Sequence, residues 1–465
     1  MSENITATLR DSKGARWTAL LILSFTMFGA YLFTEVISPL KPILERSYHW
    51  DSADFGIVTS SYSLFNVFIL MLLIVGVMLD KFGIRVSTIA STLLMIIGGT
   101  IKYIAFKGGF SLTNEINVLG LWNIKEQVFY ASLGYALFGV GCEYAGITVS
   151  KALVKWFDGK EMALAMGMQV AIARLGSFVP LAFGAYIADK QGIPTWILIG
   201  VIILILGFVA FFYYNFMDKK LDKQLVLSVE NSGSDEFKLS DLKVIFKNRG
   251  FWLIAVLCVL FYSAVFPFYK YGPDLMVNKF GVSEKWAGVL PSLVPFGTMI
   301  LTPFFGSLYD KKGKGASIMV LGAIMLVIVH IVFFVPQINS VWIAFINVLI
   351  LGIGFSLVPS AMWPSVPKII PQKQLGSAYA TIFWIQNFGL WGIPLLVGIV
   401  LDKTNPGIAA AKSAGKAVNY DYTKTWMIFV GLTIVAVFIA LWLKFEDKRK
   451  GYGLELPNIK KTEEI

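Results

Sequence analysis

Apolar residues fall in long runs along this chain, and each run is long enough to cross a lipid bilayer as an α-helix, which takes about 20 residues. Short polar segments separate the runs, and the longest of them, 218–249, contains KKLDKQ and ENSGSDE. The runs lie at 17–40, 54–79, 85–106, 128–154, 161–188, 193–217, 250–277, 284–308, 314–336, 339–366, 372–402 and 422–446. The pattern predicts an all-α membrane protein with twelve transmembrane helices. It divides them into two six-helix bundles, 17–217 and 250–446, with polar tails at 1–16 and 447–465.

The composition supports a membrane protein and explains the net charge. The chain is 56% hydrophobic and only 15% charged, whereas soluble domains carry about 25% charged residues. The net charge of +11 is unevenly distributed, because the segments predicted on one side of the membrane hold roughly twice as many Lys and Arg as those on the other. This bias places both termini and the 218–249 linker in the cytoplasm. We therefore expect a lipid bilayer as partner, and no nucleic acid.

Two neighbouring spans each carry one ionisable residue inside an apolar body. Glu143 lies in the first and Arg174 in the second, and the charged turn KWFDGKE joins the two spans. Each charge is about 14 residues from the turn, which puts both at the same depth, roughly 20 Å from the turn. An acid and a base that face one pocket suit a ligand with a positive and a negative end. The alternative is an internal ion pair that ties the two helices together.

A ten-residue motif occurs at the same place in each half of the chain. The two copies are GVMLDKFGIR (76–85) and GSLYDKKGKG (306–315). Such internal repeats are typical of secondary transporters, whose substrate site lies between the halves. We expect Gly83 and Gly313 to adopt backbone angles closed to other residues. We expect Asp80 and Asp310 to accept hydrogen bonds or to lie against a helix N-terminus.

With this repeat the chain resembles the major facilitator superfamily across essentially its whole length. In that family the loop is a latch that closes the cytoplasmic side in one conformer. The resemblance implies this role for Gly76, Asp80, Lys81, Gly83, Arg85 and Asp310. The second copy has Gly315 where the first has its arginine.

Three further stretches resemble one branch of this superfamily more closely. They are 62–67, 138–177 and 361–390, with Phe-Gly-x-Gly-x-Glu and Ile-Ala-Arg-Leu-Gly-Ser in the second. The branch contains the vertebrate lysosomal dipeptide uniporter, and it implies that an acid meets the peptide's amino group and an arginine its carboxylate. The matching positions are Glu143 and Arg174. The N-terminal tail lacks an acidic dileucine sorting signal, which favours a bacterial inner-membrane protein.

Five other residues are candidates for the substrate site. Glu35 in the first span is a candidate to bind an ammonium group or a proton, or to reach the membrane interface. Tyr62 and Asn66 are one helical turn apart on the second span and would hydrogen-bond peptide amides or hold helices together. Trp384 and Asn387 lie near the middle of the eleventh span and are the candidates from the C-terminal half. Packing and one internal hydrogen bond are the alternative for this pair.

The sequence offers no motif of an enzyme. It has no Walker loop and no His-Glu-x-x-His, and its two histidines, His49 and His330, are far apart. We expect no catalytic residue, no cofactor and no metal site. Lys270, near the outer end of the seventh span, is expected to reach toward the interface.

These observations favour a monomeric transporter that carries dipeptides, which are small zwitterionic substrates, by alternating access. One alternative is an organic-anion exchanger, in which Arg174 and Lys270 bind carboxylates and Glu143 is structural. An alternative of another class is a membrane sensor or scaffold that does not transport.

Overall fold

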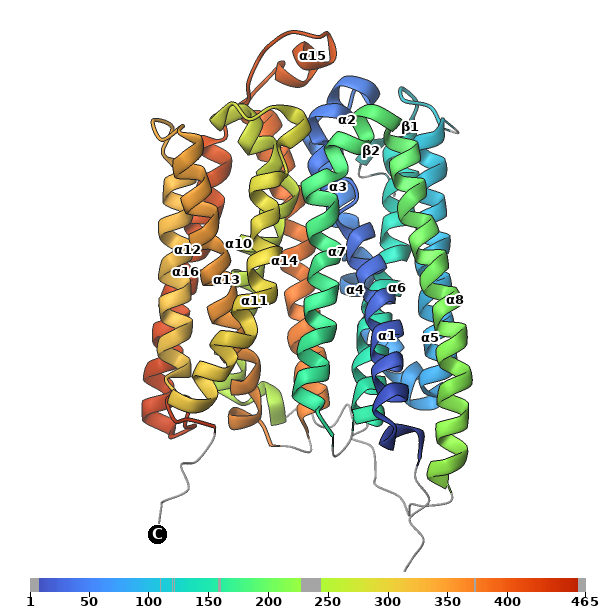
Figure 1. The fold of residues 1–465 in the computed structure, drawn as a ribbon. Helices are drawn as coiled ribbons and strands as arrows, with labels where there is room; N and C mark the ends of the chain where they lie inside the picture. Colours follow the sequence, from blue (N-terminus) through green and yellow to red (C-terminus); the bar gives the residue numbers. More distant parts are fainter. Residues whose placement is uncertain are drawn as a thin grey trace, which may run out of the picture.

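The fold consists of long helices standing side by side in two groups, with one short hairpin at an end (Figure 1). It is a computed structural model that describes residues 8–108, 110–118, 120, 122–157, 160–226, 244–371 and 374–458. The α-helices are α1 (Lys13–Thr34), α2 (Lys41–Tyr48), α3 (Ser52–Ser61), α4 (Leu64–Phe68), α5 (Met71–Lys107), α6 (Glu126–Phe157), α7 (Met162–Gln191), α8 (Ile193–Val226), α10 (Arg249–Phe280), α11 (Val289–Lys312), α12 (Gly315–Phe334), α13 (Val341–Ile369), α14 (Leu375–Thr404), α15 (Ile408–Ser413) and α16 (Thr423–Lys450). The 3₁₀ helices are η1 (Leu9–Asp11), η2 (Ser38–Leu40) and η3 (Glu284–Trp286), and the antiparallel strands are β1 (Glu115–Val118) and β2 (Trp122–Lys125).

The protein is an all-α membrane protein apart from this hairpin, which the hydropathy pattern did not indicate. Among the described residues, eleven helices are long and apolar enough to cross a membrane. The count differs from twelve because the second predicted span is divided among α3, α4 and the first part of α5. Helix α5 then continues through Gly83, whose φ of 75° and ψ of 175° are not helical, into the third span. All twelve predicted segments are therefore helical, and the second one is broken.

Close helix contacts in the N-terminal half depend on glycines. The backbones of α5 and α6 touch where Gly98 faces Gly134, and a Cβ on Gly98 would lie 2.4 Å from the Gly134 carbonyl oxygen. In a membrane, small residues allow this approach and so permit extensive van der Waals packing.

We expect Gly98→Val to destabilise the N-terminal half, because two backbones would have to separate along their contact. Overpacking typically costs about 1–3 kcal/mol and more where backbone must move. The matched control is Gly431→Val on α16, where a Cβ would have no neighbour within 4 Å. Thermal unfolding in detergent should show a lower midpoint for Gly98→Val alone, and equal midpoints for the two variants would contradict the packing argument.

One end of the molecule carries α15, α2 and the hairpin, and we call it the α15 end (Figure 1). The halves are tied together there by buried charges. Lys41 Nζ of α2 donates to Glu45 Oε1 at 2.5 Å and, across the interface, to Asp274 Oδ2 of α10 at 2.9 Å. The Asp402 carboxylate of α14 accepts hydrogen bonds from the backbone amides at the start of α3, with Ser52 N at 3.0 Å. These contacts close the α15 end.

Helix α14 packs along α3, and α11 packs along α7, so two helix pairs form the interface between the halves. Both pairs approach backbone to backbone at the α15 end. A Cβ on Gly288 would lie 2.0 Å from Leu181 O, and one on Gly398 would lie 2.2 Å from Ser52 O. Glycine is therefore required at these crossings for the closed arrangement.

The opposite end carries the start of α1 and the end of α16, and we call it the termini end (Figure 1). The C-terminal tail folds back onto α12 there. The Glu455 carboxylate accepts from the Ser317 amide at 2.7 Å, and the Gly315 amide donates to Leu454 O at 2.9 Å. These acceptors satisfy amides in the first turn of α12, which would otherwise lack partners.

Candidate functional site

A cavity of about 490 Å³ lies between the two halves. Its walls come from α1, α3, α5, α6 and α7 on one side and from α10, α11, α13 and α14 on the other. It extends from Glu35 and Lys270, toward the α15 end, to Ser150 and Gln169, toward the termini end. Ser150 is exposed, whereas buried contacts close the α15 end. This arrangement is open toward the termini end.

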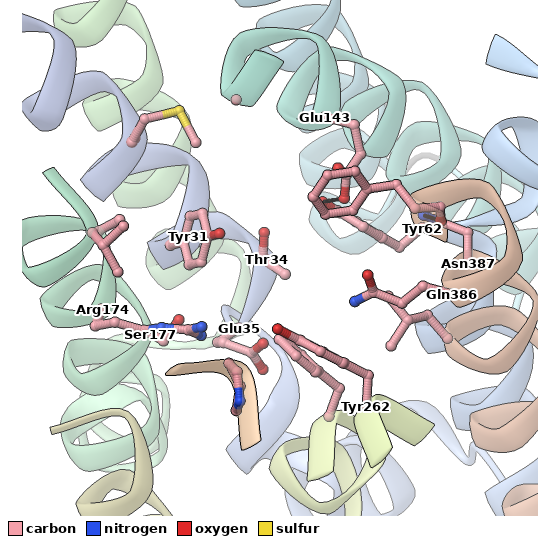
Figure 2. Close-up of a pocket in the computed structure, with 18 of the residues that line it drawn as sticks. Tyr31, Thr34, Glu35, Tyr62, Glu143, Arg174, Ser177, Tyr262, Gln386 and Asn387 are labelled. Carbon is pink, nitrogen blue, oxygen red and sulfur yellow. Dashed lines mark hydrogen bonds between the residues drawn. The ribbon is translucent and has the colours of Figure 1, made fainter. Parts of the chain in front are cut away.

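Glu143 lines this cavity from α6 and is held by one hydrogen bond. The Tyr62 hydroxyl donates to Glu143 Oε1 at 2.8 Å, and Figure 2 shows the two side chains together on one side of the cavity. Tyr62 reaches this position because α6 crosses the chain at its carbonyl, and a Cβ on Gly139 would lie 2.0 Å from Tyr62 O. The glutamate is only partly buried, so its carboxylate is available to a ligand.

Arg174 lines the cavity from α7, away from Glu143 (Figure 2). Its guanidinium carbon lies 5.8 Å from the ring centroid of Tyr31, 6.0 Å from that of Phe266 and 5.4 Å from that of Phe355. Aromatic faces stabilise a cation, but they accept no in-plane hydrogen bond. Arg174 Nη1 is buried and has no hydrogen-bond partner among the described residues. The arginine therefore presents unused donors to an anion.

Within the described chain, the ion pairs at or below 4.0 Å do not include one between Glu143 and Arg174. The alternative of an internal ion pair that ties α6 to α7 is not realised in this conformer. An acid and a base thus line one cavity without neutralising each other directly, an expensive arrangement for a protein in a membrane.

A second acid–base pair lies toward the closed end of the cavity, and it corrects the expectation for Lys270. This lysine is buried and does not reach the interface. Its ammonium donates to Glu35 Oε2 and to Thr34 O, both at 2.8 Å. Ser38 Oγ also donates to Glu35 Oε2, at 2.6 Å. Glu35 therefore neither reaches the interface nor stands alone, and its pair with Lys270 joins the N-terminal half to the C-terminal half.

The other predicted contacts divide into two groups. Tyr62 and Asn387 line the cavity, together with Gln386, whereas Asn66 and Trp384 are not part of its lining. Asn66 lies in α4, after the interruption between Ser61 and Leu64, and it is buried. Trp384 donates to Val67 O at 3.0 Å and so connects α14 to α4. Within the part of the chain that the structure describes, Asn387 Oδ1 has no hydrogen-bond partner.

The motif residues lie at the termini end and make contacts within their own half. Gly83 and Gly313 both have positive φ, 75° and 70°, which confirms the expectation that they adopt angles suited to glycine. Asp80 accepts from Lys151 Nζ at 2.5 Å and Asp310 from the Asn458 side chain at 2.7 Å. Their partners are therefore side chains rather than helix N-termini. Three motif positions remain. A Cβ on Gly76 would meet no described atom within 4 Å, and the Lys81 ammonium lies over the ring of Phe82. Arg85 forms an ion pair with Asp222 at 3.3 Å.

The sequence analysis did not anticipate that two lysines, Lys270 and Lys102, are buried. Both lie near the ends of apolar runs, where a lysine is ordinarily assigned to the interface. The sequence did contain one signal for the Glu35–Lys270 pair. The two residues lie toward the outer ends of equivalent helices, the first helix of each half. Among the described residues, no group of three or more His, Cys, Asp or Glu is placed to hold a metal ion.

Comparison with known proteins agrees with this architecture. Residues 23–394 match the Major Facilitator Superfamily. The human protein named lysosomal dipeptide transporter MFSD1 is 30% identical over 399 residues, which are 83% of this chain and 80% of that protein. The nitrite extrusion protein of Bacillus subtilis (strain 168) is 19% identical over 435 residues, 93% of this chain and 95% of that one.

Solved structures share the fold at lower identity. A bacterial homolog of the human lysosomal transporter Spinster, in an inward-facing and occupied conformation, matches with a TM-score of 0.69 and 15% identity, covering 93% of this chain and 98% of that one. The nucleoside transporter NupG, as its D323A mutant, matches with a TM-score of 0.67 and 15% identity, covering 91% and 99%. This chain therefore belongs to the Major Facilitator Superfamily, and it is a multi-pass membrane transporter rather than an enzyme.

Proposed function

We propose that this protein carries short peptides, above all dipeptides, across a membrane by alternating access. Glu143 binds the ammonium group of the ligand and Arg174 its carboxylate. The supporting observation is an acid and a base that line one cavity without pairing, the base with a buried donor that has no partner. The human relative's name, lysosomal dipeptide transporter, supports the same cargo.

The polar groups of the cavity suit a peptide with different side chains. The ends of a dipeptide are about 6 Å apart, and an arginine fork binds a carboxylate through two parallel hydrogen bonds. Gln386 and Asn387 line the cavity from the C-terminal half, and Asn387 Oδ1 is free to accept from the peptide amide. In this arrangement the protein contacts the charged ends and the backbone of the peptide. We therefore expect it to accept peptides with different side chains.

The conformer open toward the termini end is the inward-facing state in this proposal. The distribution of Lys and Arg supports cytoplasmic termini, and we propose a monomer in a bacterial inner membrane. In the outward-facing state the two halves rock about the central site. The loop 76–85, with Asp310 in its second copy, then closes the cytoplasmic side. The described partners of Asp80 and Asp310 lie within their own halves here, as in a latch that is open.

Counterflow in proteoliposomes tests the proposal. Vesicles loaded with unlabelled Ala-Ala should take up labelled Ala-Ala, and other dipeptides should compete whereas free alanine and dicarboxylates should not. In detergent, Ala-Ala should raise the melting temperature, because a ligand at 100 times its Kd stabilises the folded form by about 2.7 kcal/mol. Competition by dicarboxylates alone would replace the peptide with an organic anion as cargo. Absence of exchange for every solute tested would leave a sensor or scaffold.

A further inference from the structure

Three aromatic rings of the C-terminal half lie together beside Arg174. Tyr262 and Phe266 belong to α10 and Phe355 to α13, and all three line the cavity. The ring centroids are 5.5 Å apart for Tyr262 and Phe266, and that of Phe355 lies 5.8 Å from the first and 5.9 Å from the second. Each ring therefore packs against the other two, and we call them the three-ring cluster.

The three-ring cluster presents an apolar surface to the cavity. Phe266 and Phe355 have no polar side-chain atom, and the Tyr262 hydroxyl accepts a hydrogen bond from Trp363 Nε1 at 3.1 Å. Pro359, one helical turn after Phe355, also lines the cavity. Figure 2 shows Tyr262 projecting into the same cavity as Arg174. A ligand group that reaches this surface meets mainly carbon atoms and ring faces.

The position of Arg174 decides which part of a peptide meets the cluster. The guanidinium carbon is 6.0 Å from the ring centroid of Phe266 and 5.4 Å from that of Phe355. A carboxylate bound by this arginine belongs to the second residue of a dipeptide. The Cβ of that residue is about 2.5 Å from the carboxylate carbon, and the far end of a Leu or Phe side chain is roughly 4–7 Å from it. The second side chain is therefore within reach of the cluster.

The surface next to Glu143 is different. The ring beside this acid is that of Tyr62, whose hydroxyl donates to the carboxylate at 2.8 Å. Farther along α6 the cavity is lined by Gly146 and Ser150, with Ile147 between them. The first residue of a dipeptide, whose ammonium would meet Glu143, is therefore in more polar surroundings than the second.

We propose that the three-ring cluster is a side-chain subsite that makes the carrier prefer dipeptides with an apolar or aromatic second residue. This inference rests on the proposed function, because it assumes a peptide whose carboxylate meets Arg174. A Leu or Phe side chain buries apolar surface against the rings. A polar side chain loses its hydration there without gaining a hydrogen-bond partner. Such peptides are still carried by their charged ends, but they bind more weakly.

The subsite also belongs to the other half of the molecule. Glu143 and Arg174 lie on α6 and α7 of the N-terminal half, whereas the cluster lies on α10 and α13 of the C-terminal half. The charged ends of the peptide thus contact one half, and the second side chain contacts the other. An apolar second residue therefore draws the two halves together around the ligand.

The test compares two sequence isomers as competitors. Proteoliposomes that contain the full-length protein are loaded with Ala-Ala, and uptake of labelled Ala-Ala is measured against unlabelled Ala-Phe or Phe-Ala. The isomers have the same composition and the same charged ends, so a difference between them reports the position of the ring. Even one methylene in an apolar pocket is worth about tenfold. We expect Ala-Phe to inhibit at a concentration at least about tenfold lower than Phe-Ala, and Ala-Leu to exceed the similarly shaped Ala-Asn by as much.

Phe266→Leu separates contact with the ligand from support of the arginine. Ala-Ala uses Arg174 but has no large side chain, so a ring that acted only through Arg174 would weaken Ala-Ala and Ala-Phe by the same factor. We expect Ala-Phe to weaken about fivefold more than Ala-Ala, which is within the range of one aromatic pair. Phe268→Leu is the matched control on the same helix, because the Phe268 ring stacks on Phe333 at 5.4 Å and is not part of the cavity lining. It should leave the ratio of the two peptides unchanged.

The outcomes distinguish this subsite from the proposed function. Intact Ala-Ala counterflow with equal inhibition by Ala-Phe and Phe-Ala, or with stronger inhibition by Phe-Ala, would overturn the subsite and leave the peptide carrier in place. Equal weakening of Ala-Ala and Ala-Phe in Phe266→Leu would overturn the contact between this ring and the ligand. Failure of Ala-Ala counterflow in the wild type would overturn the proposed function instead. If Phe266→Leu does not fold, the isomer comparison on the wild type decides alone.

Discussion

Replacing Arg174 by Gln should reduce dipeptide transport at least roughly 30-fold, because truncation of a buried charged contact costs about 2–5 kcal/mol. Glu143→Gln should have a comparable effect. It is the cleaner change, since its amide oxygen still accepts from the Tyr62 hydroxyl and only the charge is lost. Arg174→Lys should not restore full activity, because a lysine cannot form the planar bidentate contact.

Glu143→Gln and Arg174→Gln should also differ in which charged end of the peptide they no longer recognise. In the wild type, N-acetyl-Ala-Ala and Ala-Ala-amide should both compete poorly with Ala-Ala, since each lacks one charged end. Glu143→Gln should lose the discrimination against the N-acetylated peptide, and Arg174→Gln the discrimination against the amide. Binding measured by thermal shift in detergent gives this pattern without requiring transport. The reverse pattern would exchange the two roles, and normal transport by either variant would remove that residue from the site.

Gly288→Val should hold the protein with its α15 end open. The new Cβ would lie 2.0 Å from Leu181 O, so α11 and α7 cannot keep their present crossing, whereas the open state does not need it. Each 1.4 kcal/mol of such strain shifts the two conformers by about tenfold. We expect transport to fall by about tenfold or more in a protein that remains folded.

Spin labels give the direct measurement for this variant. Labels at Lys190 of α7, which is exposed, and at Lys285 of η3 lie on opposite halves at the α15 end. Their separation should increase in Gly288→Val. Gly297→Val on the same helix is the matched control, because a Cβ there has no neighbour within 4 Å. An unchanged distance distribution together with normal transport would show that the crossing tolerates a side chain.

The hydropathy pattern was sufficient for the helices but not for their interruptions. Apolar runs place a segment in the bilayer whatever its backbone hydrogen bonds, so the second span gave no sign that it breaks beside Tyr62 and again near Leu70, whose φ is 55°. At the first break, α6 crosses the backbone at Tyr62 next to Gly139, a contact between segments far apart in the sequence. No local signal in the second span reports that contact.

The sequence predicted that Glu143 and Arg174 face one cavity because each lies the same number of helical residues from the turn that joins their spans, which gives both the same depth in the membrane. Lys270 and Lys102 were out of reach of this argument. The partner of Lys270 is on the other half, and nothing in the spacing along one helix shows which residues of two separate bundles will meet. Asn66 is not part of the cavity lining, and its role in the site stays a prediction.

The tail that seats on α12 has a consequence for how the molecule is made. The acceptors for the first turn of that helix come from Leu454 and Glu455, which are translated long after α12 and only after α16. The N-terminal bundle does not wait for these two residues, but the first turn of α12 lacks them while α13, α14 and α16 are being made. Its termini end is therefore completed only after the other helices of the C-terminal bundle have been synthesised.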